Sequence, residues 1–196
     1  MKVQIRIQKI ICFSALIISA ICFVFALGLL HDIYNVHLAI GWGVYMKKDL
    51  FLEMQPFNTS LVNSCIVLIL LSALLFATLT HKRRNYYITN YISSVIFFGY
   101  SVYHFIFSVT NISDCRSRFL TETNFEGYKK ITETVTEIKY TESTFWLDIN
   151  IILSSVALLM GLVVLGNLIW KIILMKNERT FLSSQYIKNK PAEVNE

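Results

Sequence analysis

Polar side chains recur every three or four residues between positions 90 and 108, and one of them is ionisable. The set is Asn90, Ser94, Ser101, His104 and Ser108, with Phe97 at the same rhythm. This spacing places the side chains on one face of a helix. The face has two interpretations: hydrogen bonds to neighbouring helices, which we favour, or the lining of a polar path. His104 is kept as a candidate functional residue, because ionisable groups inside membrane spans commonly have a functional role.

No other group of residues has the spacing of a catalytic or metal site. The four cysteines make no CxxC motif and no His/Cys pair at metal-ligand spacing. The sequence also contains no H-E-x-x-H, P-loop or G-x-S-x-G pattern. We therefore predict a protein that is not an enzyme and that uses no cofactor or metal. The less favoured alternative is an enzyme that modifies lipid at the outer leaflet with His31, His37 or His104.

The composition predicts that these residues lie in a membrane protein. The chain of 196 residues is 55% hydrophobic and has a mean hydropathy of +0.53. Only 16% of its residues are charged, against about 25% in soluble domains. A membrane-spanning helix needs about 20 apolar residues, and four stretches qualify: residues 10–30, 61–80, 87–109 and 149–174. We predict a single all-α integral membrane domain, a bundle of four transmembrane helices embedded in the lipid bilayer.

The basic residues predict how the four spans are threaded. Lysine and arginine are concentrated before the first span, between the second and third, and at the end of the fourth or after it: Lys2, Arg6, Lys9, Lys82, Arg83, Arg84, Lys171, Lys176, Arg179, Lys188 and Lys190. Because cytoplasmic loops carry the excess of Lys and Arg, both termini are predicted to be cytoplasmic in a multi-pass protein of the cell membrane. The short basic run at 81–84 thus predicts topology and not nucleic-acid binding. Residues 31–60 and 110–148 become outer loops, and 175–196 a cytoplasmic tail. Two glycosylation sequons, at Asn58 and Asn111, fall on the outer side.

Residues 36–54 are largely apolar although they belong to the first predicted outer loop. Their large and small side chains alternate with period two, on either side of a possible turn at 46–49, which predicts a β-hairpin. Residues 131–140 are rich in β-branched side chains and are predicted as a third strand, with a helix as the alternative. Together they predict a small β cap over the outer end of the bundle; the alternative is a segment lying among lipid headgroups. Four aromatic side chains of this region are candidates for binding a partner: Trp42, Tyr45, Phe51 and Phe57.

Small residues predict where the helices approach one another most closely. In the first and fourth spans they occur mainly at four-residue spacing: Ala15, Ser19, Ser154, Ala157 and Gly161. No acidic or basic residue lies at the middle of a span, and no span contains proline, which argues against an ion-coupled transporter. The favoured function is an accessory or assembly subunit of a larger membrane complex, which binds other membrane subunits through its helix seams and outer loops. The main alternative is a homo-oligomeric channel or small carrier lined by the polar face of the third span.

Overall fold

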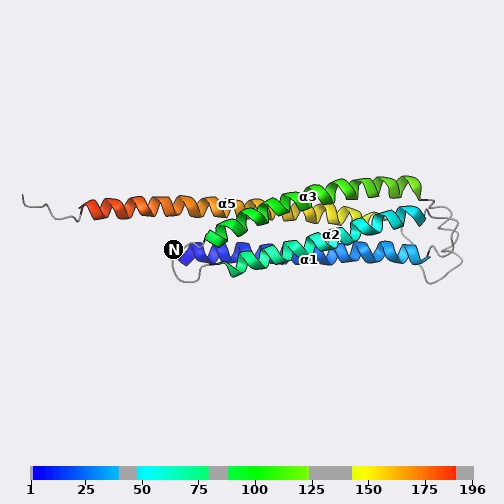
Figure 1. Cartoon of the computed structure of the whole chain (residues 1–196), viewed down its shortest axis with the longest axis horizontal. Coiled ribbons are helices and arrows are strands. Elements are labelled where there is room, and N and C mark those ends of the chain that lie inside the picture. The colour runs from blue at the N-terminus through cyan, green and yellow to red at the C-terminus, as the bar shows by residue number, and fades with distance from the viewer. Residues whose placement is uncertain (1, 40–47, 80–87, 124–142, 189–196) are drawn as a thin grey trace, which may run out of the picture.

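The computed structural model describes residues 2–39, 48–79, 88–123 and 143–188, and within these ranges the chain forms four helices. They are α1 (Lys2–Ala39), α2 (Lys48–Ala77), α3 (Ile88–Glu122) and α5 (Phe145–Lys188). The helices run in alternating directions along one axis (Figure 1). Each of α1 and α3 packs against both α2 and α5, so the four helices enclose one interior. The all-helical, four-helix architecture predicted from the sequence is therefore confirmed for the described residues.

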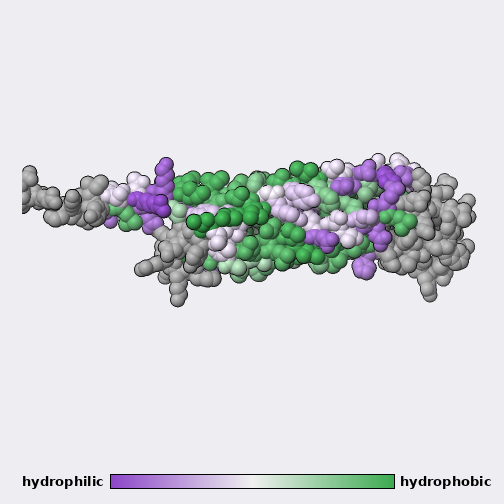
Figure 2. All heavy atoms as spheres, in the orientation of Figure 1, coloured by the Kyte–Doolittle hydropathy of each residue, from purple (hydrophilic) through white to green (hydrophobic). Residues whose placement is uncertain are grey.

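All four helices have the length and composition of membrane spans. Each contains a stretch without Asp, Glu, Lys or Arg: 10–31 in α1, 54–77 in α2, 88–113 in α3 and 149–170 in α5. At 1.5 Å per residue these stretches are about 33–39 Å long, which suits a hydrocarbon core of about 30 Å with its interfaces. The visible face of the bundle is mostly apolar along its middle and more polar toward both ends (Figure 2).

The two ends of the bundle are named here by the helices that meet there. The terminal end is where α1 begins and α2 ends, and the distal end is where α1 ends and α2 begins. At the distal end two ion pairs join neighbouring helices. Arg118 of α3 binds Glu53 of α2, with Nη2 2.7 Å from Oε2, and Arg116 of α3 binds Asp148 of α5, with Nε 2.7 Å from Oδ1.

The β-hairpin predicted for residues 36–54 is wrong wherever the structure describes that segment. Residues 36–39 continue α1, and residues 48–54 form the first turns of α2. Leu50 and Met54 explain the error, because side chains four apart share a face in a helix and also in a strand. Both are buried, whereas Leu52 between them is exposed, which is the helical pattern. Residues 40–47, with Trp42 and Tyr45, and the predicted strand at 131–140 lie outside the described residues.

The helices extend well beyond the predicted spans. α1 has 38 residues and α5 has 44. Parts of both predicted outer loops are therefore helical. In the first, α1 continues to Ala39 and α2 begins at Lys48; in the second, α3 continues to Glu122 and α5 begins at Phe145. The predicted polar tail is likewise helical as far as Lys188. Beyond the most hydrophobic stretches, buried residues still recur every three or four positions, as a helix packed on one face requires. In α3 these residues are Ile112, Cys115 and Phe119.

The predicted small-residue seams lie inside the bundle. Their five members, Ala15, Ser19, Ser154, Ala157 and Gly161, are all buried. The Ser19 hydroxyl is 2.9 Å from that of Ser72, which joins α1 to α2. A Cβ atom on Gly161 would lie 2.9 Å from the Cβ of Ser101, so α5 and α3 approach closely at this point. These seams pack the four helices of this chain against one another.

Gly28 of α1 lies against Trp146 of α5, and it gives a direct test of the packing. A Cβ atom there would overlap the indole ring of Trp146. We expect Gly28→Ala to lower the free energy of unfolding by about 1–3 kcal/mol, because overpacking forces neighbours out of position. Gly99→Ala is the matched control, since nothing lies within 4 Å of that position. Unfolding in mixed SDS and mild-detergent micelles measures both, and equal stabilities for the two variants would contradict this packing.

Candidate functional site

The polar face of α3 points into the bundle. All six residues of the predicted rhythm are buried: Asn90, Ser94, Phe97, Ser101, His104 and Ser108. Their side chains therefore face α2 and α5, the two helices against which α3 packs. Most of their hydrogen bonds gather in two clusters, one around His104 near the middle of α3 and one around Asn90 at the terminal end.

The first cluster joins three helices through the imidazole ring of His104. Its Nδ1 is 2.9 Å from the Ser64 hydroxyl of α2, and its Nε2 is 3.4 Å from the Ser154 hydroxyl of α5. The phenol of Tyr100 donates to the same Ser64 oxygen at 3.1 Å. Both ring nitrogens are thus engaged by serines, and which serine donates determines which nitrogen carries the proton. The sequence showed His104 and Ser154 but gave no reason to place Ser64 beside them.

A serine hydroxyl beside an imidazole is the elementary pair of a nucleophile and a base. A working pair of this kind also needs an oriented third group and access for a substrate. His104 is only 1% exposed and Ser64 is also buried. Among the described residues, the groups that bond the imidazole are serine hydroxyls and not a carboxylate. This arrangement suits a structural hydrogen-bond bridge, and His31, exposed near the distal end of α1, is not brought to it.

The second cluster joins all four helical segments at the terminal end through the amide of Asn90. Its Oδ1 accepts hydrogen bonds from Lys171 Nζ of α5 at 2.7 Å and from Gln8 Nε2 of α1 at 3.3 Å. Its Nδ2 donates to the hydroxyl of Thr78, the residue after α2, at 3.0 Å. One asparagine side chain therefore connects α1, α3 and α5 to the end of α2.

Lys171 differs from its predicted role. It is one of the basic residues predicted to set the topology, yet it is only 1% exposed. Among the described residues, its recorded polar partner is the neutral amide of Asn90. In α5, Lys171 continues a series of buried residues at alternating spacings of four and three: Asn150, Ser154, Ala157, Gly161, Val164, Leu168 and Lys171. Met160 and Asn167, outside the series, are buried as well.

Phe97 separates the two clusters along α3. It is one of the largest fully buried side chains. The serines on either side of it, Ser94 and Ser101, donate to the backbone carbonyls of Asn90 and Phe97, four residues earlier, at 2.8 Å each. Their hydroxyls thus bond within α3 and do not link the His104 cluster to the Asn90 cluster. The two clusters are therefore separate.

Distal to His104, three buried polar side chains lack hydrogen-bond partners among the described residues. They are Asn58 of α2, at both amide atoms, Ser108 of α3, and Thr123, the residue after α3. The rings of Phe57 and Phe107, 5.6 Å apart, bring α2 and α3 together at this level. Asn58 is also the first predicted sequon residue, and its side chain is 1% exposed in the folded bundle. The second sequon residue, Asn111, is in α3 and donates to the carbonyl of Phe107 at 2.7 Å.

The aromatic residues proposed for partner binding do not form one described surface. Phe57 is half-buried and packs on Phe107 within the bundle. The backbone of Phe51 is part of α2, while Trp42 and Tyr45 belong to the segment outside the described residues. Among the described residues, no group of three or more His, Cys, Asp or Glu side chains is arranged to hold a metal ion.

The chain matches no protein-family model, no curated protein and no solved structure. Its function is therefore inferred from the geometry of its own residues.

Proposed function

We propose that this chain is a non-enzymatic, four-span membrane protein that serves as an accessory or assembly subunit of a larger membrane complex. The observation that carries the proposal is the part of α5 that projects beyond the bundle (Figure 1). The Tyr91 hydroxyl bonds Met175 Sδ at 3.3 Å, which places Met175 level with the beginning of α3. Residues 176–188, named here the α5 extension, continue for about 20 Å past this point.

The surface of the α5 extension favours a protein partner. Phe181 and Leu182 are 60% and 57% exposed, on a segment that also carries Lys176 and Arg179. An isolated helix shorter than about 12–15 residues is marginal in water, so a single helix of this length gains from a partner that covers it. Large apolar side chains on one helix commonly enter the groove of a binding partner. We propose that another membrane subunit supplies that groove.

The burial of the α3 polar face supports this proposal over a pore lined by that face. His104 bonds Ser64 and Ser154 of the same chain, and Asn90 bonds Lys171 and Gln8. For the face to line a channel between copies of the chain, α3 would have to rotate and break both sets of bonds. Phe97, buried between them, would also have to leave the path.

We further propose that both termini and the α5 extension are on the cytoplasmic side of the cell membrane. Exposed basic residues of the terminal end support this orientation, namely Arg6, Lys9, Lys176 and Arg179, because Lys and Arg are concentrated on the cytoplasmic side of membrane proteins. The distal end instead carries acidic residues in its described part: Glu53, Asp114, Glu122 and Asp148.

Cysteine labelling tests this orientation, because all four native cysteines are buried. An impermeant thiol reagent applied to intact cells is expected to label Asp114→Cys at the distal end and to leave Gln185→Cys in the α5 extension unlabelled. Both positions are exposed, so permeabilised cells should show equal labelling of the two variants. Labelling of Gln185→Cys from outside intact cells would overturn the orientation.

The proposed function itself is tested by purification from the native membrane in a mild detergent. We expect a different membrane protein to co-purify in a fixed ratio with the full-length chain. The contribution of the α5 extension is then measured with substitutions at Phe181 and Leu182, as argued in the Discussion. A monomer free of stoichiometric partners in several mild detergents would contradict the proposal.

A further inference from the structure

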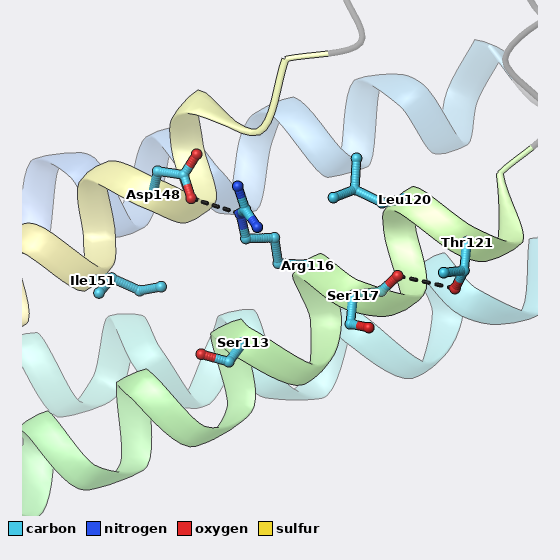
Figure 3. Close-up of a pocket in the computed structure, with 7 residues that line it drawn as sticks. All are labelled: Ser113, Arg116, Ser117, Leu120, Thr121, Asp148 and Ile151. Atoms are coloured by element: carbon cyan, nitrogen blue, oxygen red, sulfur yellow. Dashed lines mark hydrogen bonds and ion pairs between the residues drawn. The ribbon is translucent and has the colours of Figure 1, made fainter.

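An open cavity of about 400 Å³, lined by both polar and apolar residues, lies between α3 and α5 at the distal end of the bundle (Figure 3). Its polar lining includes Ser113, Arg116 and Ser117 of α3 and Asp148 of α5, with Leu120 and Ile151 as apolar neighbours. Its volume lies within the range of about 300–1,000 Å³ that is usual for small-molecule sites. None of these residues belongs to the His104 or Asn90 clusters.

Among the described residues, the ion pair across the cavity leaves hydrogen-bond donors of Arg116 without a partner. Arg116 reaches from α3 to α5 and uses its Nε to bind Asp148 Oδ1 at 2.7 Å (Figure 3). The other carboxylate oxygen, Oδ2, accepts from Thr144 at 2.6 Å. In the described part of the chain, no hydrogen bond is recorded for the Nη atoms of Arg116 or for the hydroxyls of Ser113 and Ser117. A guanidinium held at one edge, with both Nη groups open, suits the two oxygens of a phosphate.

The cavity lies at the depth where lipid headgroups meet the protein. The uncharged stretch of α3 ends at residue 113, and that of α5 begins at residue 149. Toward the middle of the bundle the same helix faces become apolar. Ile106, two turns from Ser113 on its face of α3, is 58% exposed, and Ile152, one turn from Asp148 on α5, is 56% exposed. A ligand with a polar head and long apolar chains would place its head in the cavity and its chains along the apolar surface toward the middle of the bundle.

The charges of the cavity distinguish between classes of headgroup. Arg116 contributes one positive charge and Asp148 one negative charge, and both side chains are partly exposed, at 43% and 44%. An anionic headgroup would be attracted by one and repelled by the other. A zwitterionic headgroup satisfies both, since its phosphate can bind the Nη atoms and the serine hydroxyls. Its ammonium can then bind the carboxylate, which keeps free lone pairs.

The geometry points to a binding site for a zwitterionic phospholipid in this cavity, with the phosphate on Arg116, the ammonium on Asp148 and the acyl chains along the outer faces of α3 and α5. Bound lipid would fasten the distal ends of these two helices together. This site is independent of the α5 extension, which lies at the other end of the bundle. Failure of the lipid site would therefore leave the proposed function untouched.

Lipid retention by the purified full-length chain tests the site. The chain is exchanged into mixed micelles with equal amounts of phosphatidylethanolamine and phosphatidylglycerol, and the retained lipid is counted by native mass spectrometry. We expect one phosphatidylethanolamine per chain. Arg116→Gln should reduce its retention about tenfold through loss of charge-assisted hydrogen bonds. Asp148→Asn should shift the preference toward phosphatidylglycerol.

Two further variants keep the result interpretable. Arg118→Gln removes a cation of the same end that pairs with Glu53 and Glu122, and it should leave lipid retention unchanged. Ser117→Leu fills the cavity without touching the ion pair, so it should abolish retention in a chain that still folds. Equal retention of the two lipids by the wild type, or full retention by Ser117→Leu, would overturn the proposal. Binding of soluble phosphoethanolamine as tightly as the lipid would overturn a phospholipid as the occupant.

Discussion

Replacing Asn90 with alanine is expected to lower the free energy of unfolding by about 3 kcal/mol, among the largest effects of any single substitution in the bundle. The variant would leave the ammonium group of Lys171 without the acceptor that it contacts at 2.7 Å. It would also remove the acceptor of Gln8 and the donor to Thr78. Removing one partner of a buried charged group costs more than the bond itself contributes, because the remaining group stays desolvated and unpaired.

A double-mutant cycle separates this effect from a simple loss of packing. Lys171→Met keeps most of the side-chain volume and removes the charge, so it should be much less destabilising than Asn90→Ala. The double variant Asn90→Ala/Lys171→Met should recover most of the lost stability, because no unpaired cation remains. Unfolding in SDS and mild-detergent micelles measures all three variants. Additive effects of the two substitutions would contradict the coupling between these residues.

Replacing both Phe181 and Leu182 with serine is expected to reduce recovery of the partner subunit at least about tenfold, since exposed hydrophobic anchors carry much of the binding energy of an interface. The stability of the bundle should not change, because both side chains lie past Met175 and are exposed. The measurement is the ratio of partner to chain after purification in a mild detergent, followed by unfolding of the same samples.

Ser183→Ala/Ser184→Ala provides the matched control for the α5 extension. Both hydroxyls bond carbonyls of their own helix, Ser183 to Thr180 at 2.8 Å and Ser184 to Phe181 at 2.7 Å, so their removal should leave partner recovery unchanged. Wild-type recovery in the Phe181/Leu182 variant would eliminate the α5 extension as the binding element. Equal loss in both variants would point to a general effect on the helix and not to the two apolar side chains.

The sequence predicted the spans and the interior face of α3 for related physical reasons. A membrane span requires about 20 apolar residues, and four uncharged stretches of that length are visible without any knowledge of tertiary contacts. The spacing of the residues from Asn90 to Ser108 can also be recognised in the sequence alone, because side chains three and four residues apart share a helix face. The structure shows that this face is buried, although a role for it beyond packing stays a prediction.

Other features depend on contacts that a pattern does not contain. The alternation at residues 50–54 fits a strand, but Leu50 and Met54 are also one helical turn apart, and the exposure of Leu52 between these two buried residues decides for the helix. The residue type of Lys171 does not reveal whether its side chain faces the cytoplasm or contacts Asn90 inside the bundle. The bond between Ser64 and His104 joins positions 40 residues apart, so it depends on the register between α2 and α3.

The most direct test of the account is the mass of the complex that this chain forms in bilayer nanodiscs drawn from the native membrane. We predict one species in which the chain accompanies a different membrane protein at a fixed ratio. A chain truncated after Met175 should insert and fold but lose that protein. The account would be contradicted if the full-length chain were found alone, or only with copies of itself.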